Sequence, residues 1–254
     1  MSEAGEYFLN NPSGTTATAT VPSSPDWQTT YSNIISLYIP YFTRLPDELK
    51  KKFLERTYHF RSLKSFHFIG ITEQAEIPIL ISAAAAQLTL GLEKYELPFF
   101  KDIYVTTDAY KSEGANELYV GHVAPDGIYL SWKYFLQGYS NGQDNVNVAI
   151  HELAHALVHE SFIEEAGVDW DFRTDFSKFT EQSGPEMIKW LTSRKSFLRP
   201  YAFTNFQEFW AVSVEAFFES PAEFKRQMPE LYTSLSNVLN QDLLSPGIVL
   251  PQQY

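Results

Sequence analysis

Residues 146–158 read VNVAIHELAHALV, and this stretch gives the clearest indication of the fold. Its apolar residues recur at the three- and four-residue spacing of an α-helix, which predicts an amphipathic helix. The apolar stripe consists of Val146, Ala149, Ile150, Leu153, Ala154, Leu157 and Val158. The other side carries Asn147 and three histidines, His151, His155 and His159. We therefore expect a helix that packs inward through its apolar stripe and presents imidazole groups on the opposite side.

Two of these histidines have the spacing of metal ligands. His151 and His155 are four residues apart, so on a helix they are neighbours and can converge on one ion. Glu152 is offset from them by about 100° around the helix axis. This is the H-E-x-x-H pattern, in which two imidazoles hold zinc and the glutamate serves as the general base of a protease. The alternative is a solvated polar helix face that carries two histidines and binds nothing.

The surroundings of the motif favour a cation. No lysine or arginine occurs between Tyr134 and Phe172, whereas acidic residues are frequent in this stretch. His159 lies about 12 Å from His151 along the helix axis, too far to share the same ion. Its position also differs from the last histidine of H-E-x-x-H-x-x-G-x-x-H, which excludes the metzincin class. The third ligand of a catalytic zinc site must therefore come from another segment.

Residues 201–215 offer candidates for that ligand. The stretch Thr-Asn-Phe-Gln at residues 204–207 can form a capping box that opens a helix, and Pro221 ends it. Glu208 falls in the first turns of this helix. Glu215 lies about 10 Å further along nearly the same face, so the two carboxylates cannot both bind one ion. The alternative for Glu208 is a role as the capping acid of Asn205.

Together these segments resemble the Mlc titration factor A (MtfA) family of zinc peptidases, which is similar to the catalytic domain of anthrax lethal factor. The resemblance covers roughly residues 31–235. It rests on LP at 45–46, ISAAAAQLTLGL at 81–92, IYLSW at 128–132, VAIHELAH at 148–155, and the segment in which Glu208 follows Tyr201 by seven residues. The chain departs from the family pattern at Leu153, where phenylalanine is frequent, and at residues 158–159, where an aspartate usually follows the motif.

The resemblance implies an α+β, zincin-like metallopeptidase domain that is mostly helical, with a small sheet beside the helix that carries H-E-x-x-H. It gives the third zinc ligand as Glu208, beside His151 and His155, and leaves Glu215 as support behind the ligands. It also implies that Tyr201 reaches toward the reacting carbonyl oxygen. The alternative for Tyr201 is a buried aromatic residue whose hydroxyl group caps a loop.

The expected activity is zinc-dependent hydrolysis of peptide or protein substrates, of the gluzincin type. An aminopeptidase-like activity is one form of it that we consider. One Zn²⁺ ion per chain is expected to activate a water, Glu152 to take its proton, and Tyr201 to stabilise the oxyanion. An exposed strand edge is expected to pair with the extended peptide. The resemblance also raises a second class of function, a regulatory protein that sequesters the transcriptional repressor Mlc. A purely structural zinc site is disfavoured because such sites usually have four protein ligands.

Composition excludes several classes of fold and function. The chain has 254 residues, a formal net charge of −12 and no cysteine. The absence of cysteine excludes disulfide scaffolds, thiol nucleophiles and thiolate metal sites. The negative charge disfavours binding to nucleic acid or to an anionic membrane surface. Residues 77–92 form the longest uncharged apolar stretch, which is short for a membrane span and predicts a buried helix, so we expect a cytoplasmic protein.

The length favours one domain with extensions at its ends. Residues 1–30 are rich in Ser, Thr, Ala, Gly and Pro, and they lack the features of a signal or transit peptide. We expect a polar leader over residues 1–30, the zinc metallopeptidase domain over residues 31–235, and a C-terminal tail over residues 236–254.

The remaining patterns predict helical pieces over residues 34–58 that break at Pro40 and Pro46, then a strand over residues 64–69, with Thr72 as the N-cap of the next helix. Residues 103–107, 117–123 and 127–132 predict strands of a small sheet, the last two forming a hairpin. Beyond residue 132 we expect helices with breaks at residues 184–185, 200 and 220–221. The isolated histidines His59, His67 and His122 are expected to be ordinary core or surface residues.

Overall fold

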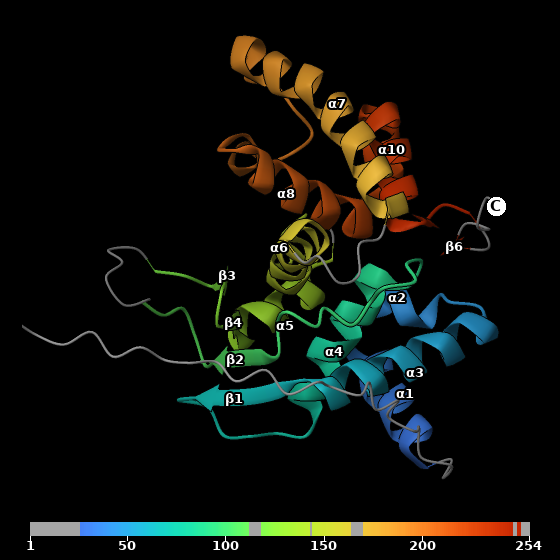
Figure 1. The fold of residues 1–254 in the computed structure, drawn as a ribbon, viewed down its shortest axis with the longest axis vertical. Helices are drawn as coiled ribbons and strands as arrows, with labels where there is room; N and C mark the ends of the chain where they lie inside the picture. Colours follow the sequence, from blue (N-terminus) through green and yellow to red (C-terminus); the bar gives the residue numbers. More distant parts are fainter. Residues whose placement is uncertain (1–25, 112–117, 143, 164–169, 246–247, 250–254) are drawn as a thin grey trace, which may run out of the picture.

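The computed structural model describes residues 26–111, 118–142, 144–163, 170–245 and 248–249. The α-helices are α1 (Asp26–Tyr38), α2 (Pro40–Thr43), α3 (Asp47–Leu63), α4 (Glu76–Thr89), α5 (Trp132–Ser140), α6 (Val148–Ile163), α7 (Trp170–Ser193), α8 (Phe206–Glu219), α9 (Pro221–Gln227) and α10 (Pro229–Leu239). A short 3₁₀ helix, η1 (Pro200–Phe203), precedes α8. The strands are β1 (Ser65–Ile69), β2 (Asp102–Thr106), β3 (Gly121–Ala124), β4 (Gly127–Ser131), β5 (Gln241–Asp242) and β6 (Ile248–Val249). Helices dominate and a small sheet lies to one side (Figure 1), so the α+β class is confirmed.

The larger sheet has the strand order β1-β2-β4-β3. Strands β1, β2 and β4 run parallel, while β3 pairs antiparallel with β4 and forms the predicted hairpin. The hairpin turns at Gly127, whose φ is +154°. A Cβ atom at this position would lie 2.5 Å from the carbonyl oxygen of Asp102, so the close approach of β2 requires glycine. Strands β1 and β3 are the two edges of the described sheet.

One face of this sheet carries a row of stacked rings that crosses all four strands. His67 of β1 stacks on Tyr104 of β2 with a centroid distance of 4.7 Å. Tyr129 of β4 stacks on Tyr104 and on His122 of β3, at 4.4 Å in each case. The strand register places these residues directly opposite one another. Such cross-strand pairs stabilise a sheet, so the row fixes the position of the edge strand β3.

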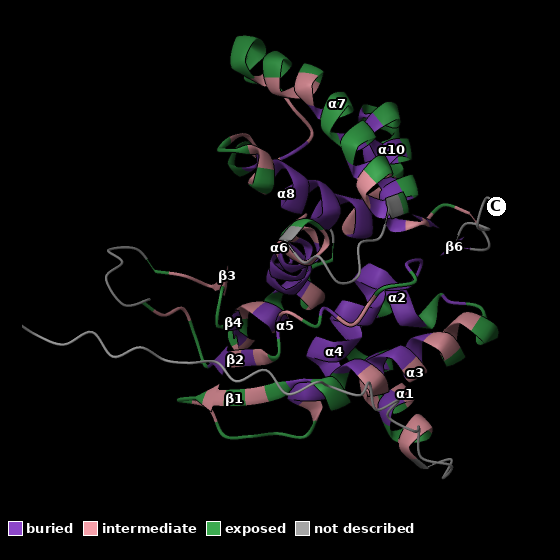
Figure 2. Cartoon of the chain, in the orientation of Figure 1, coloured by how far each residue is buried: buried purple, intermediate pink, exposed green. Residues whose placement is uncertain are grey.

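Helix α6 lies between the sheet and helix α8, and it packs against α4, α8, β3 and β4 (Figure 1). Its predicted apolar stripe is buried through Ala149, Ile150, Leu153, Ala154 and Leu157. Figure 2 shows α4, α6 and α8 as largely buried helices at the centre of the fold. The predicted inward-packing helix is therefore confirmed, and it lies at the centre of the fold between the sheet and α8.

The predicted stripe is wrong at its first residue. Val146 precedes the helix and is exposed. The cause is Asn147, whose Oδ1 atom accepts a hydrogen bond from the backbone N–H of Ile150 at 3.1 Å. This interaction satisfies one of the free N–H groups of the first turn, so the helix begins at Val148.

Helix α4 is the buried helix expected within residues 77–92, and every residue from Ile77 to Thr89 is buried. Thr72 does not cap it, because the helix begins at Glu76 after Ala75. A start at Thr72 would place Pro78 in the helix interior, where proline removes a hydrogen bond and clashes with the preceding turn. With the start at Glu76, Pro78 falls in the first turn, where the missing N–H has no cost.

The break predicted at residues 184–185 is also wrong, because α7 continues through Pro185 to Ser193. Pro185 cannot donate a hydrogen bond to the carbonyl group of Glu181, four residues earlier. Glu181 is exposed, so water can solvate the freed carbonyl group and the helix persists. The breaks at Pro40, at Pro46 and at residues 220–221 are confirmed, and a 3₁₀ helix begins at Pro200.

Helices of the described chain span both expected domain boundaries. Helix α1 begins at Asp26, within the expected leader, and residues 1–25 lie outside the described residues. The boundary expected after residue 235 falls inside α10, and Gln241 beyond it is fully buried. The side-chain amide of Gln241 donates hydrogen bonds to the carbonyl groups of Gln87 and Leu88, so this segment packs onto the domain. Across the described residues, we find no helix long and apolar enough to span a membrane.

Candidate metal and active site

Helix α6 brings the two imidazoles of the motif together. The Nε2 atoms of His151 and His155 lie 3.2 Å apart, with the two rings nearly perpendicular. This follows from the four-residue spacing on one helix face. His151 is buried, whereas His155 is partly exposed. Both Nε2 atoms therefore face the same point beside the helix.

Helix α8 contributes a carboxylate to that point. The Oε2 atom of Glu208 lies 3.0 Å from Nε2 of His151 and 3.6 Å from Nε2 of His155. The predicted capping box at residues 204–207 is wrong, because the N-cap of α8 is Asn205. Its Oδ1 atom accepts a hydrogen bond from the backbone N–H of Glu208 at 2.9 Å. The backbone of Glu208 thus completes the cap, and its carboxylate faces the imidazoles.

The three side chains fit a metal ion. Each offers one ligand atom, and these atoms all lie within 4.8 Å of one another. Two donor atoms bound to a tetrahedral zinc ion at about 2.0–2.1 Å lie about 3.3 Å apart. The three measured separations, 3.0, 3.2 and 3.6 Å, bracket that value. The Oε2 atom of Glu208 is also buried and faces both imidazoles, so a cation bound between the three side chains would contact it directly.

Electrostatic interactions keep Glu208 in its ionised form. Burial raises the pKa of Glu208, but hydrogen bonding and charge interactions with His151 and His155 outweigh burial and hold the pKa well below its usual range. Burial lowers the pKa of His151, and the carboxylates of Glu208 and Glu215 overcome this effect and raise the pKa to about 10. The site thus stabilises a positive charge between its carboxylates, which is the condition a cation requires.

A buried carboxylate lies behind His151. The Oε1 atom of Glu215 is 2.6 Å from Nδ1 of His151, and its Oε2 atom accepts a hydrogen bond from the backbone N–H of Asn147 at 2.6 Å. Glu215 is 1% exposed. When Nδ1–H donates to this carboxylate, the Nε2 lone pair is directed into the site. Glu215 therefore lies behind His151 and outside the cluster of His151, His155 and Glu208.

Arg199 completes this buried network, and sequence reasoning missed it. Its Nη2 atom lies 2.7 Å from Oε1 of Glu215, and its Nη1 atom lies 3.0 Å from Oε2. Nη1 also donates to the carbonyl group of Asn145. A buried carboxylate needs a cationic partner, so the arginine two residues before Tyr201 could have been identified once Glu215 was taken as buried.

Glu152 lies on α6 next to His151 and is buried. It packs against β3, where a Cβ atom on Gly121 would lie 2.7 Å from its Cγ and 2.9 Å from its Oε1. The position of the carboxylate therefore depends on glycine in the edge strand. Burial raises the pKa of Glu152, the charge of His151 opposes the rise, and Glu208 adds to it, which brings the pKa to about 7. A carboxyl group with such a pKa can both accept and release a proton near neutrality.

Tyr201 lies in η1 and faces the same site. The Tyr201 and His151 ring centroids are 6.0 Å apart. The alternative of a buried loop-capping tyrosine is wrong, because the residue is 50% exposed. Burial of part of the side chain raises its pKa, and the charge of Glu208 and a side-chain hydrogen bond with it raise the pKa further, to about 12. The hydroxyl group therefore stays protonated and can donate a hydrogen bond.

These groups line a cleft of about 540 Å³. One wall is the edge strand β3 with Gly121, His122 and Val123, and the other side is formed by α6, α7 and the start of α8. His122, expected to be an ordinary histidine, thus lines the cleft, and its Nδ1 atom lies 2.7 Å from the hydroxyl oxygen of Tyr110. His159 lines the cleft too and, as expected, is not one of the clustered ligand residues.

Comparison with known proteins agrees with this site. The sequence profile of a family described as glucose-regulated metallo-peptidase M90 matches residues 15–239. The chain belongs to the M90 metallopeptidase family. This is the MtfA family named by the resemblance, so the domain is a zincin-like metallopeptidase domain of the α+β class. An uncharacterized protein of Synechocystis sp., slr2042, is 25% identical over 241 residues, which cover 84% of this chain and 83% of the relative.

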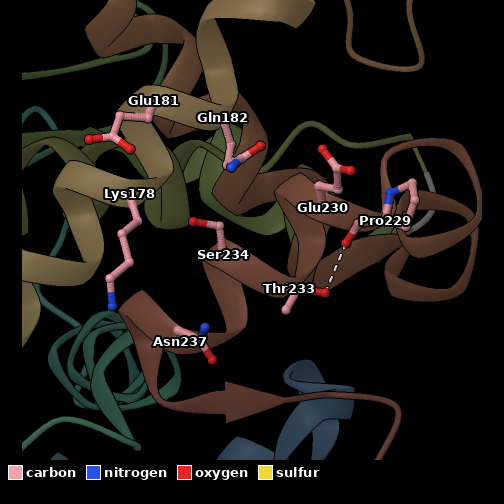
Figure 3. Close-up of a pocket in the computed structure, with 8 residues that line it drawn as sticks. All are labelled: Lys178, Glu181, Gln182, Pro229, Glu230, Thr233, Ser234 and Asn237. Carbon is pink, nitrogen blue, oxygen red and sulfur yellow. Dashed lines mark hydrogen bonds between the residues drawn. The ribbon is translucent and has the colours of Figure 1, made fainter.

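A second hollow of the M90 metallopeptidase lies between α7 and α10 and has a volume of about 440 Å³ (Figure 3). Its lining includes Lys178, Glu181 and Asn237, and it contains no histidine. Within the described part of the chain, the one cluster of side chains suited to a metal ion is His151, His155 and Glu208. The second hollow therefore offers no competing metal site.

Proposed function

We propose that this M90 metallopeptidase is a zinc-dependent peptidase of the gluzincin type, with His151, His155 and Glu208 as the zinc ligands. The observation that carries the proposal is the convergence of one donor atom from each of these residues, in a cleft that also contains Glu152 and Tyr201. Three protein ligands leave one position open for water or substrate, which is typical of catalytic rather than structural zinc. The two nitrogen donors and one oxygen donor also suit zinc better than the oxygen-preferring ions calcium and magnesium.

The chemistry follows from the groups around the open position. A bound zinc ion would act as a Lewis acid and lower the pKa of a water molecule toward about 7. Glu152 takes a proton from the attacking water and returns it to the leaving amine. Its pKa of about 7 suits both transfers at neutral pH. The neutral hydroxyl group of Tyr201 donates a hydrogen bond to the carbonyl oxygen as negative charge develops on it.

Strand β3 is our candidate for the edge that holds the peptide backbone. It pairs with β4 on one side, and no other described strand pairs with its second side. Its residues Gly121, His122 and Val123 line the cleft. An extended peptide that adds to β3 by main-chain hydrogen bonds would run through the cleft beside Glu152 and the ligands.

Metal analysis and a peptide panel test the proposal together. We expect purified wild-type protein to contain about one zinc ion per chain and to hydrolyse unstructured peptides, including amino acid nitroanilides that report an aminopeptidase-like activity. The variant Glu152→Gln should keep the metal and lose hydrolysis, whereas Glu208→Ala should lose most of its metal affinity. Full activity of Glu152→Gln, or unchanged metal content of Glu208→Ala, would contradict the proposal.

The alternative role as a protein that sequesters a transcriptional repressor stays a prediction from the family resemblance. The cytoplasmic location stays a prediction from the sequence pattern. Glu152→Gln separates this role from catalysis, because it removes the general base and leaves the surface nearly unchanged. Equal capture of a repressor by wild type and Glu152→Gln would support the binding role.

A further inference from the structure

The cleft continues past the proposed ligands into a section with apolar walls. Val158 and Phe162 of α6, Phe176 of α7, and Phe206 and Trp210 of α8 line this section, which we call the aromatic end of the cleft. Among the described residues that line the cleft there is no lysine or arginine, and the acidic ones are the two carboxylates of the catalytic end. The described lining of the aromatic end is therefore apolar and uncharged.

Ring contacts hold the aromatic end in place. The indole Nε1–H of Trp210 donates a hydrogen bond to the carbonyl group of Ala154 at 2.9 Å, which anchors the ring to α6. The ring of Phe176 lies 5.0 Å from Trp210, 5.3 Å from Phe162 and 5.9 Å from Phe206. Phe162 is still 45% exposed, although it is large and apolar. The walls are thus preformed and retain apolar surface that a ligand can cover.

The polar groups at this end are neutral. Burial lowers the pKa of His159, which favours its uncharged imidazole. The ring packs against Phe99 and Phe100 at 4.7 and 5.0 Å, and its Nδ1 atom is buried without a hydrogen-bond partner. The guanidinium carbon of Arg173 lies 5.2 Å from the Phe162 ring, but Arg173 does not line the cleft. A charged side chain entering here would lose its hydration, and none of the described residues that line this end carries a charge to compensate.

We propose that the aromatic end of the cleft binds a bulky, uncharged side chain of the substrate, aromatic or branched aliphatic, next to the bond that is cut. Acidic and basic side chains are excluded from this position. The inference rests on the proposed peptidase function and adds the class of side chain that selects the cleavage site. The residues that set the preference are specificity residues, and Phe162 is the most accessible of them.

The test uses metal-loaded protein and a set of internally quenched peptides that differ at one position, with Phe, Leu, Ala, Asp or Lys there. The varied position is moved along each side of the bond, and cleavage sites are mapped by mass spectrometry. At one position beside the bond, we expect kcat/KM for Phe and Leu to exceed that for Ala by about tenfold or more, with Asp and Lys lower still.

Two variants of one residue assign this preference to the aromatic end. Phe162→Ala should reduce the Phe-to-Ala ratio of kcat/KM several-fold, and Phe162→Lys should raise the Asp-to-Phe ratio at least tenfold. Such ratios come from one preparation, so they do not depend on how much of the protein is folded. Leu37→Ala, which removes an exposed apolar side chain from α1 outside the cleft, is the matched control and should leave both ratios unchanged.

The outcomes separate the two proposals. If metal-loaded wild-type protein cuts none of the peptides, the peptidase function fails and this inference fails with it. If peptides are cut without preference at any position, or if both Phe162 variants keep the wild-type ratios, the peptidase function stands and the assignment of the aromatic end is wrong.

Discussion

The Nδ1 atom of His151 lies 2.6 Å from Oε1 of Glu215, a carboxylate that is almost completely buried. Arg199 contacts both oxygens of the same carboxylate. This arrangement links His151 on α6 to α8 and to the segment just before Tyr201. In the proposed metal site, the orientation of His151 would therefore depend on Glu215 and Arg199, which do not bind the ion themselves.

The first prediction concerns this network. Glu215→Gln removes the charge that orients His151 and leaves Arg199 without its buried counter-ion. We expect metal affinity to fall about 10–100-fold, as measured by competition with a chromogenic chelator. Glu230→Gln, at an exposed position on α10, is the matched control and should bind metal like wild type. Wild-type affinity in Glu215→Gln would show that the network does not support the ligands.

The second prediction concerns the space beside Glu152. Gly121→Ala introduces a Cβ atom 2.7–2.9 Å from that side chain, so the carboxylate has to move. We expect kcat to fall by at least tenfold while metal content stays at the wild-type level, since a general base must keep hydrogen-bond geometry with the water. Gly142→Ala, where a Cβ atom meets nothing within 4 Å, should have full activity. Equal kcat values for both variants would refute a positioning role for Gly121.

The third prediction concerns the hydroxyl group of Tyr201. Tyr201→Phe keeps the ring beside His151 and removes the proposed hydrogen bond to the carbonyl oxygen. Loss of one such donor typically lowers kcat by about 10²–10³-fold, and we expect a loss in this range with little change in KM or in metal affinity. The control is Tyr38→Phe, which removes an exposed hydroxyl group from α1. An unchanged kcat would leave Tyr201 only a packing role.

The local patterns of the sequence predicted much of this architecture. Helical spacing alone identified α6, and proline positions identified the ends of α1, α2 and α8, because these features depend on neighbouring residues. The pairing of His151 with His155 follows from the same spacing. The approach of Glu208 came from the family resemblance, since it depends on how α8 crosses α6.

The features that the sequence did not reveal depend on contacts between distant segments. Arg199 gains its role only when Glu215 is buried beside it, and Gly121 matters only because β3 packs against Glu152. His122 was assigned to the ordinary histidines, although the edge strand places it in the wall of the cleft. Pro185 was expected to break α7, but Glu181, which loses its hydrogen-bond donor, is an exposed residue that water can solvate, and the helix continues.

A fourth prediction concerns stability and pH. Burial raises the pKa of Glu219 from its ordinary value of 4.5, and the charges of Asp144 and Glu215 add to the rise, which brings the pKa to about 8. Between these values the folded state holds a proton that the unfolded state has released. The contribution of Glu219 to the free energy of unfolding therefore decreases as pH rises from about 4.5 to about 8 and is constant above that.

Glu219→Gln should remove this pH dependence. We expect the variant to become more stable relative to wild type as the pH rises from 5 to 8. The measurement is the free energy of unfolding of both metal-free proteins in urea titrations. Glu230→Gln, on the exposed surface of α10, should show a constant difference. A difference for Glu219→Gln that is also constant with pH would contradict the raised pKa.

Anomalous diffraction at the zinc edge, from crystals grown with zinc, tests the metal site most directly. We expect one strong peak per chain, within about 2.0–2.2 Å of the Nε2 atoms of His151 and His155 and of a carboxylate oxygen of Glu208. Absence of a peak between these three residues, or a peak coordinated by other residues, would contradict the proposed zinc site and the peptidase mechanism built on it.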